Sequence, residues 1–386
     1  MPADTAAPRG SGRRVLISCG EASGDLYAGA LTRQLRRLDP TITVAGFGGP
    51  QLAAAGAELI EDYRRFSVTG LVEALRVLPR SWRMLRTIGA VARDSRPDVF
   101  VAIDFPDFNL RLLPPMHEMG IPIVYYISPQ LWAWRAGRIK HIRRYVSKML
   151  VIFPFEVEVY EGAGVPVEFV GHPLIELASA SRPRDRWLVD HRLDPARPIL
   201  ALLPGSRPNE VSLLLPVFAE AVPRIASAVP GVQFIVARAP SLPDALFETI
   251  RHVPSTTIVE GETDDVLSAA DAVVTASGTA TVQTAIHGKP MVIVYRLSGL
   301  TYAMGRRFVK VTTYGMVNLI AGRTIVPELI QDACTPARVA EEAVSLLTDR
   351  ARTDTMRGDI AAMRVKLGGV GASEHAARAV LSAVRG

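Results

Sequence analysis

Short, continuous runs of apolar residues recur along the chain and alternate with longer amphipathic segments. Because these runs are continuous rather than alternating with polar residues, they predict strands that are buried on both faces. The segments between them predict helices, for example over 25–38, 209–228 and 336–347. Alternation of strands and helices is typical of an α/β fold with parallel sheets and right-handed crossovers. The predicted strands are 15–18, 98–104, 121–127, 148–153, 167–171, 198–204, 232–237, 256–261, 271–277 and 289–295.

The predicted strands fall into two groups of similar size. Residues 179–198 between them are charged and rich in proline, so they predict a connector with a short helix. We expect an N-terminal domain over 12–173 and a C-terminal domain over 174–366. The last helix, within 367–386, is free to pack on either half, including a return to the N-terminal domain. Open parallel sheets bind ligands beyond the carboxyl ends of their strands, so two facing sheets predict a cleft between the domains.

Composition and charge exclude several classes of protein. With 386 residues and 48% hydrophobic residues, the chain is long enough for two globular domains. A net charge of +6, scattered along the sequence, argues against nucleic-acid binding. The apolar run over 15–19 is too short for a signal peptide, and no unbroken run of about 20 apolar residues predicts a membrane span. We therefore expect a cytoplasmic protein whose membrane contact, if present, is peripheral.

The metal-binding residue types are sparse. Cys19 and Cys334 cannot form a disulfide framework or a cysteine-rich metal site. His141, His172 and His287 are isolated, and no pair has the spacing of metal ligands. The sequence therefore predicts neither a metal nor another cofactor.

The turn after the first predicted strand has the sequence GEASGD, residues 20–25. Small residues allow the backbone to approach a ligand, and a helix start offers unpaired N–H groups. Ser23 or Asp25 as a helix cap is the simpler alternative, but it does not account for Glu21 beside two glycines. We interpret Glu21, Ser23 and Asp25 as ligand-facing residues.

A second pair of carboxylates follows the strand predicted over 98–104. Asp104 and Asp107 lie at its carboxyl end, where burial is costly unless a carboxylate is solvated, hydrogen-bonded or catalytic. Asp107 or Asn109 fits the cap of the following helix better than Asp104 does. Asp104 is therefore the candidate general base, with a structural role as the alternative.

The turns of the second half predict anion binding. LPGSR, residues 203–207, and ASGTATVQT, residues 276–284, each join a strand end to a helix start, where backbone N–H groups can hold a phosphate. Neither is a Walker P-loop, and an ordinary β–α turn is the alternative for each. NLIAGR, residues 318–323, is a further polar loop, for which a surface turn is the alternative. The candidate ligand-binding residues are Gly205, Ser206, Arg207, Ser277, Gly278, Thr279, Ala280, Thr281, Asn318 and Arg323.

The segment 70–92 predicts amphipathic helices with an arginine-rich edge. Pro79 is expected to split it into two helices. We expect its apolar side, which includes Trp82, to face the core. Contact of the basic edge with anionic lipid is the alternative.

Taken in order, seven segments resemble the lipid-A-disaccharide synthase family over 14–380. The resemblance implies two Rossmann-like domains facing across a cleft, the GT-B fold, and no metal. The segments are GEASGD, AGFGGPQLAAAG, DFPDFN, SPQLWAWR, LPGSR, ASGTAT and NLIAGR.

The resemblance also implies a reaction. Members join UDP-2,3-diacylglucosamine to 2,3-diacylglucosamine 1-phosphate at the inner face of the inner membrane, releasing UDP. Asp104 and Arg207 lie at the positions of the family's catalytic carboxylate and arginine. Gln283 stands where similar enzymes often carry a Glu suited to ribose hydroxyls, and a Gln can still hydrogen-bond a hydroxyl.

Alternatives to this reaction remain open at the level of sequence. The same scaffold suits another UDP-sugar enzyme such as an epimerase. It also suits an inactive UDP-sugar-binding protein. The oligomeric state is not encoded in a readable pattern, so a homodimer stays open.

Overall fold

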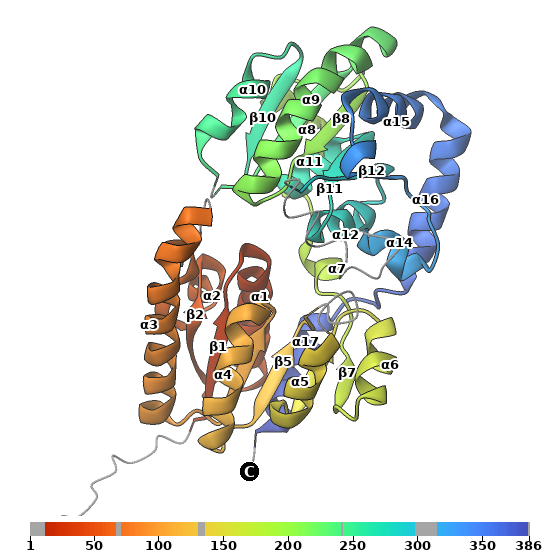
Figure 1. The fold of residues 1–386 in the computed structure, drawn as a ribbon. Coiled ribbons are helices and arrows are strands. Elements are labelled where there is room, and N and C mark those ends of the chain that lie inside the picture. Colours follow the sequence, from red (N-terminus) through yellow and green to blue (C-terminus); the bar gives the residue numbers. More distant parts are fainter. Residues whose placement is uncertain (1–11, 67–70, 130–135, 241, 298–314, 385–386) are drawn as a thin grey trace, which may run out of the picture.

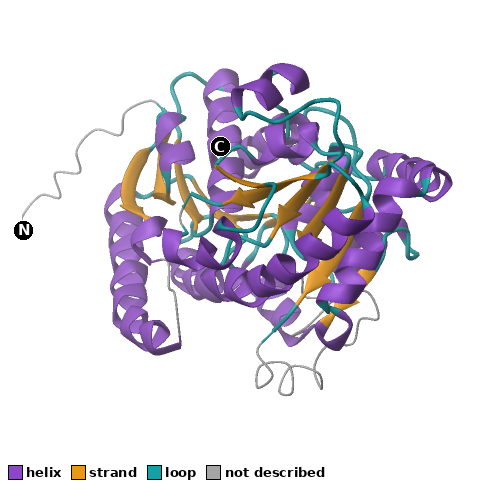
Figure 2. Ribbon diagram, turned by 90° about the horizontal axis from the view of Figure 1, so that it is seen from above, coloured by secondary structure: helices purple, strands orange, loops and turns teal. Residues whose placement is uncertain are grey.

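The computed structural model describes residues 12–66, 71–129, 136–240, 242–297 and 315–384. They form two lobes, each built on one parallel sheet (Figure 1). Helices cover the faces of the strands when the molecule is seen from above (Figure 2). The predicted α/β fold class, with two Rossmann-like sheets in the GT-B arrangement, is confirmed.

The first sheet has the strand order β3-β2-β1-β4-β5-β6-β7. The order reverses between the neighbouring strands β1 and β4, which makes this position the topological switch point of the sheet. Its strands are β1 (Arg14–Cys19), β2 (Thr43–Gly48), β3 (Glu58–Asp62), β4 (Val99–Ile103), β5 (Ile123–Tyr126), β6 (Lys148–Val151) and β7 (Val167–Phe169). Its helices are α1 (Ala22–Leu38), α2 (Pro50–Ala54), α3 (Leu71–Ser95), α4 (Pro106–Glu118), α5 (Ile139–Tyr145) and α6 (Phe155–Gly162).

The second sheet repeats this plan in the order β10-β9-β8-β11-β12-β13, with its switch point between β8 and β11. Its strands are β8 (Ile199–Leu203), β9 (Gln233–Arg238), β10 (Thr256–Glu260), β11 (Ala272–Ala276), β12 (Met291–Tyr295) and β13 (Glu328–Ile330). The helices of this part of the chain are α7 (Leu174–Leu177), α8 (Arg184–Asp190), α9 (Pro208–Ala228), α10 (Glu248–Arg251), α11 (Thr263–Ala269), α12 (Thr279–Ile286), α14 (Met316–Ala321), α15 (Pro336–Thr348) and α16 (Arg350–Val365).

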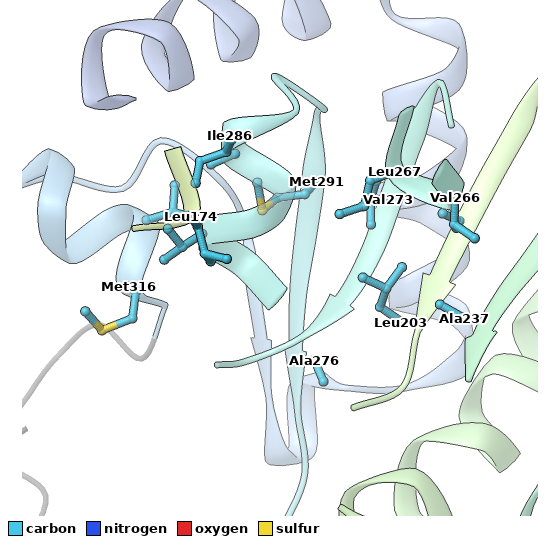
Figure 3. Packing of buried hydrophobic residues seen from close by; sticks show 14 of the residues in the cluster. Leu174, Leu203, Ala237, Val266, Leu267, Val273, Ala276, Ile286, Met291 and Met316 are labelled. Atoms are coloured by element: carbon cyan, nitrogen blue, oxygen red, sulfur yellow. The ribbon is translucent and has the colours of Figure 1, made fainter. Parts of the chain in front are cut away.

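The central strands are buried on both faces, as their continuous apolar sequences predict. Every residue of β4, β8 and β11 is buried. Figure 3 shows part of this core in the second lobe, where Leu203, Val273 and Val266 belong to one apolar cluster. Rigid packing of this kind fixes the strand ends, and therefore the turns that follow them.

Two local expectations were wrong. The segment around Pro79 is one helix, α3, and not two. A proline within a helix removes one hydrogen bond but does not have to end the helix when the rest of it is held by packing. Trp82 does not face the core: it is 54% exposed, while Met84 and Ile88 are buried.

The chain crosses between the lobes twice. After β7 it enters α7, which contacts α12 of the second lobe. After α16 it returns to the first lobe, where α17 (Ala372–Ala383) packs against α1 and the strands β4 to β6. The two crossings lie side by side, since the His172 amide donates to the Leu367 carbonyl at 2.8 Å.

Among the described residues one helix, α9, is long and apolar enough to cross a membrane. It packs against α15 and α10 of the second lobe. Its buried side chains include Val211, Leu214 and Phe218, as expected for a core helix.

Candidate functional site

Four of the predicted ligand-binding turns lie at the two switch points. In the first sheet, residues 20–25 follow β1 and residues 104–109 follow β4. In the second sheet, residues 203–207 lead from β8 into α9, and residues 276–281 lead from β11 into α12. The crevice at a switch point is where open α/β sheets bind ligands. The fold therefore brings these four segments to the ligand-binding edges of their sheets.

An ion pair joins the two lobes at this place. Arg207 Nη2 from the second lobe lies 3.0 Å from both Oε1 and Oε2 of Glu21 from the first. The nearby Glu21 carboxylate raises the pKa of Arg207. Both side chains are substantially exposed, at 62% and 42%, so the pair can open to admit a ligand.

Asp104 lies close to that ion pair. Burial raises its pKa from 3.8 to about 7, and the negative charge of Glu21 adds to this rise. The Phe105 amide and the Arg207 guanidinium act in the opposite direction. A carboxylate with a pKa near neutrality can accept a proton from a hydroxyl more readily than an ordinary aspartate can. Asp104 and Arg207, predicted from separate motifs, thus influence one another across the lobes.

The turn after β4 differs from the predicted helix cap. Neither Asp107 nor Asn109 caps α4: the N-cap is Phe105, which makes no side-chain cap hydrogen bond. Asp107 instead forms an ion pair with Arg138. The Phe105 ring lies over Gly20, where a Cβ atom would come within 2.2 Å of it. Phe105 was not among the predicted site residues, and its unusual backbone gives no sequence signal.

Glu210, which the sequence analysis missed, fills the turn formed by residues 203–207. It accepts hydrogen bonds from the backbone at Ser206 and Arg207, and its Oε1 lies 3.4 Å from Arg207 Nη1. Burial raises its pKa. Gly205 has φ +108°, and a Cβ there would lie 2.6 Å from Glu210 Oε2. This carboxylate, three residues after the N-cap, has capping-box spacing. The amides of Ser206 and Arg207 are therefore occupied by Glu210, and the group of this turn that can bind a ligand is the Arg207 side chain.

The start of α12 is more open. Gly278 has φ +135°, and the space where a Cβ would lie is empty to 4 Å. It is the N-cap, and no side chain caps it. Thr281 Oγ1 donates to the Gly278 carbonyl at 2.7 Å, and the Ser277 amide donates to Val294 of β12 at 3.1 Å. Gly278 and Thr279 are exposed, while Ala280 is half-buried. The first turn of this helix is thus solvent-exposed and has no side-chain cap, as an anion site requires.

The carboxylate of Asp25 is buried and hydrogen-bonded within the protein, so it does not face a ligand as the sequence predicted. It is 1% exposed and accepts hydrogen bonds from the backbone amides of Gly49, Gln51 and Leu52 at 2.8, 2.9 and 3.0 Å. Asp25 therefore caps α2, the helix that follows the glycine-rich segment 46–50. Ser23, in the first turn of α1, is half-buried.

The segment 318–323 is not the predicted loop: residues 318–321 belong to α14, which ends at Ala321. Asn318 is buried, donates to Val326 O and Glu328 Oε1 at 2.8 Å, and accepts from the amides of Ile325 and Val326. Arg323 forms an ion pair with Asp359 and is 62% exposed. Asn318 therefore ties α14 to the segment that leads into β13.

Gln283 takes part in a polar cluster on the half-buried side of α12. Its Nε2 donates to Asp264 Oδ1 at 2.7 Å, and His287 Nε2 lies 2.8 Å from the same oxygen. Asp264 lies on α11, nineteen residues before Gln283, so no local sequence pattern pairs the two.

Within the described ranges, no group of three or more His, Cys, Asp or Glu residues is placed to hold a metal ion. Trp132 and Trp134 of the SPQLWAWR segment lie outside the described residues.

Comparisons with known proteins show which family this chain is similar to. The family model described as lipid-A-disaccharide synthetase matches residues 15–382. The lipid-A-disaccharide synthase of Geobacter metallireducens is 43% identical over 373 residues, covering 96% of this chain and 97% of the relative. That of Myxococcus xanthus is 41% identical over 372 residues, covering 95% and 97%.

Solved structures share the fold at low identity. A UDP-GlcNAc 2-epimerase from Neisseria meningitidis, bound to UDP-GlcNAc, has a TM-score of 0.70 at 12% identity, covering 96% of this chain and all of that one. The kitacinnamycin glycotransferase has a TM-score of 0.63 at 20% identity, covering 98% and 100%. The family resemblance read from the seven segments is confirmed. With a family model and relatives above 40% identity spanning nearly its whole length, the chain belongs to the lipid-A-disaccharide synthase family of GT-B glycosyltransferases.

Proposed function

We propose that this chain transfers the diacylglucosamine group of UDP-2,3-diacylglucosamine to 2,3-diacylglucosamine 1-phosphate, forming a β-1,6-linked disaccharide 1-phosphate and UDP. The observation that carries the proposal is the meeting of Asp104, Glu21 and Arg207 across the lobes. A base from one sheet and a cation from the other suit a reaction between two substrates that enter from opposite sides.

In this mechanism Asp104 takes the proton from the acceptor 6-hydroxyl as the oxygen attacks the anomeric carbon of the donor. The bond from that carbon to the UDP oxygen breaks on the opposite face, so the configuration at the carbon inverts. Glu21 and Ser23 line the acceptor side of the site.

The leaving UDP gains negative charge in the transition state. Arg207 and the start of α12 at Ser277–Thr281, through the amides of Gly278, Thr279 and Ala280, would stabilise that charge, which lowers the barrier more than it lowers the energy of the bound donor. Gly205 and Ser206 place Arg207, while Gln283, Asn318 and Arg323 belong to the donor side. Opening of the Arg207–Glu21 ion pair would accompany donor binding.

We also propose peripheral docking on the cytoplasmic face of the inner membrane, because both lipid substrates carry acyl chains. The support is the exposed face of α3, where Trp82 stands beside Arg80, Arg83 and Arg86. Sedimentation with vesicles that contain anionic phospholipid tests it. Replacing Trp82 and Arg83 by Ala should weaken binding, and unchanged binding would count against docking by α3.

Mass spectrometry of the products from the two purified lipid precursors tests the reaction. The expected products are the disaccharide 1-phosphate and UDP in equal amounts. Conversion of UDP-N-acetylglucosamine without an acceptor would favour an epimerase instead. Binding of UDP without turnover, with both precursors present, would favour an inactive binding protein.

A further inference from the structure

Two consecutive residues at the end of β4 have a left-handed backbone. Asp104 has φ +45° and Phe105 has φ +48°. Neither is glycine, and each such conformation costs about 1–3 kcal/mol unless the surroundings hold it. The strain lies at the proposed base, so whatever holds this turn decides where the carboxylate points.

One support is Asn109, which is fully buried in the first turns of α4. Its Nδ2 donates to the Asp104 carbonyl at 2.8 Å and lies 3.2 Å from the carbonyls of Ile103 and Ser18. Its Oδ1 accepts from Ser18 Oγ at 2.6 Å. A single amide thus ties the ends of β1 and β4 together across the switch point.

The other support is Tyr125 on the neighbouring strand β5. Its hydroxyl donates to the same Asp104 carbonyl at 2.8 Å. Burial raises the pKa of Tyr125, and the nearby Asp104 charge raises it further, so the phenol stays protonated and remains a donor. The Asp104 carbonyl therefore receives two donors from two different elements, both fully buried.

We propose that Asn109 and Tyr125 are positioning residues that hold the strained backbone of Asp104 and so aim its carboxylate at the reacting hydroxyl. The inference rests on the proposed function, in which Asp104 accepts the proton. Neither residue touches substrate. Without their hydrogen bonds the turn can relax to an ordinary backbone conformation, which swings the Asp104 side chain away from its position beside Glu21 and Arg207.

A matched pair of variants tests this on the full-length enzyme. Tyr125→Phe removes only the hydroxyl that donates to Asp104. Tyr126→Phe makes the same change on the next residue of β5, whose hydroxyl is buried and has no hydrogen-bond partner among the described residues. We expect Tyr125→Phe to lower kcat about 10-fold, the loss of one hydrogen bond, with KM changed less than about twofold. Tyr126→Phe should leave both unchanged.

The pH profile separates positioning from a purely structural role. The charged or titratable groups that face Asp104 are Glu21, Arg207, Tyr27 and Tyr125. In Tyr125→Phe the first three remain, while the released carboxylate becomes better solvated. The acid limb of the kcat profile should therefore move downward from about pH 7 toward the ordinary range. A variant that only loses stability would keep its acid limb in place.

Asn109→Leu is the second variant, because it is uncharged and similar in size but loses the donors to Asp104. It should lower kcat and shift the same limb. If it fails to fold, Tyr125→Phe alone decides. Equal kcat and equal acid limbs for Tyr125→Phe and Tyr126→Phe would overturn the inference. Asp104→Asn, assayed in parallel, distinguishes failure of the proposed function from failure of this inference. If Asp104→Asn is active, Asp104 is not the base. If Asp104→Asn is inactive while Tyr125→Phe behaves like the wild type, Asp104 remains the base and only the positioning role is wrong.

Discussion

The two switch points share a topology but differ in chemistry. In the first lobe the turn after β4 holds a strained, partly buried carboxylate, fixed by Asn109 and Tyr125. In the second lobe Gly205 and Gly278 supply the left-handed backbone positions, and the charged group is the exposed Arg207. A buried carboxylate suits proton transfer, and an open helix start with a guanidinium suits an anion. Two sheets of the same topology can therefore carry different parts of one reaction, proton transfer in the first lobe and anion binding in the second.

The largest expected effect is on the first lobe. Asp104→Asn removes the proposed proton acceptor but keeps the size of the side chain, so we expect kcat to fall by about 10²–10⁴-fold. UDP release with both lipid substrates measures it, with circular dichroism as the check on folding. Turnover near that of the wild type in a folded variant would remove Asp104 as the base.

The second lobe should be almost as sensitive. Arg207→Ala should cost about 10²–10³-fold in kcat, because the charge on the departing UDP loses its cation. Arg37→Ala is the matched control, since Arg37 is equally exposed at 62% but pairs with Glu374 at the surface of the first lobe. Similar losses in both variants would show that Arg207 has no special place.

The pH dependence follows from Asp104 alone. Its carboxylate must be deprotonated to act, so kcat should fall about tenfold per pH unit below about pH 7. The stability of the fold depends on pH in the opposite direction to kcat. The folded chain binds this proton more tightly than the unfolded chain, so between about pH 4 and 7 this group lowers the free energy of unfolding as the pH rises.

Urea unfolding of the wild type and Asp104→Asn at several pH values isolates that contribution. Comparison of the two proteins is needed because His172 also titrates. Burial lowers the pKa of His172 to about 3, so its contribution to the free energy of unfolding rises with pH, opposite to that of Asp104. Relative to the wild type, Asp104→Asn should gain stability as the pH rises. A constant difference between the two proteins would show that the pKa of Asp104 is ordinary.

A smaller effect is expected at the open turn. Gly278→Ala meets no atom within 4 Å, but φ +135° strains any other residue, at a cost of about 1–3 kcal/mol. We expect a lower melting temperature and weaker UDP binding by calorimetry. Gly120→Ala in the first lobe also has open space and a positive φ, and it should lower stability without weakening UDP binding. Equal losses of UDP affinity would argue against a site at α12.

The smallest effect is expected at Gln283. Gln283→Glu would place a second carboxylate beside Asp264, which Gln283 now contacts at 2.7 Å. Repulsion should reduce stability by roughly 1 kcal/mol and change the KM for the UDP-sugar only a few-fold. Gln283→Met, which keeps the length but removes the amide, is the control for packing. A loss of kcat above tenfold in Gln283→Glu would give this position a direct part in catalysis.

Most of the fold could be predicted because its strands are buried on both faces. Each of the ten apolar runs is a strand, from β1 and β4 to β12. The remaining strands carry weaker patterns: β3 begins with Glu58 and ends with Asp62, and β13 has three residues. β2 ends with Gly46 to Gly48, and glycines are not typical of strands.

The site could be predicted only as far as strand ends reveal it. Asp104 and Arg207 were identifiable because each follows a predicted strand. The role of Asp25 was not, because its three amide donors come from a segment more than twenty residues away. Likewise no pattern signals that Phe105 has a left-handed backbone, or that Tyr125 reaches the carbonyl of Asp104 from another strand.

The return of α17 to the first lobe has a mechanical consequence. A single linker would allow the two lobes to rotate about any axis relative to each other. Here two tethers run together, joined by the hydrogen bond from His172 to Leu367 and by Glu176, whose carboxylate accepts from the amides of Gly371 and Ser373. Paired tethers resist twisting but permit bending, so we expect the lobes to open and close mainly by bending about this double connection.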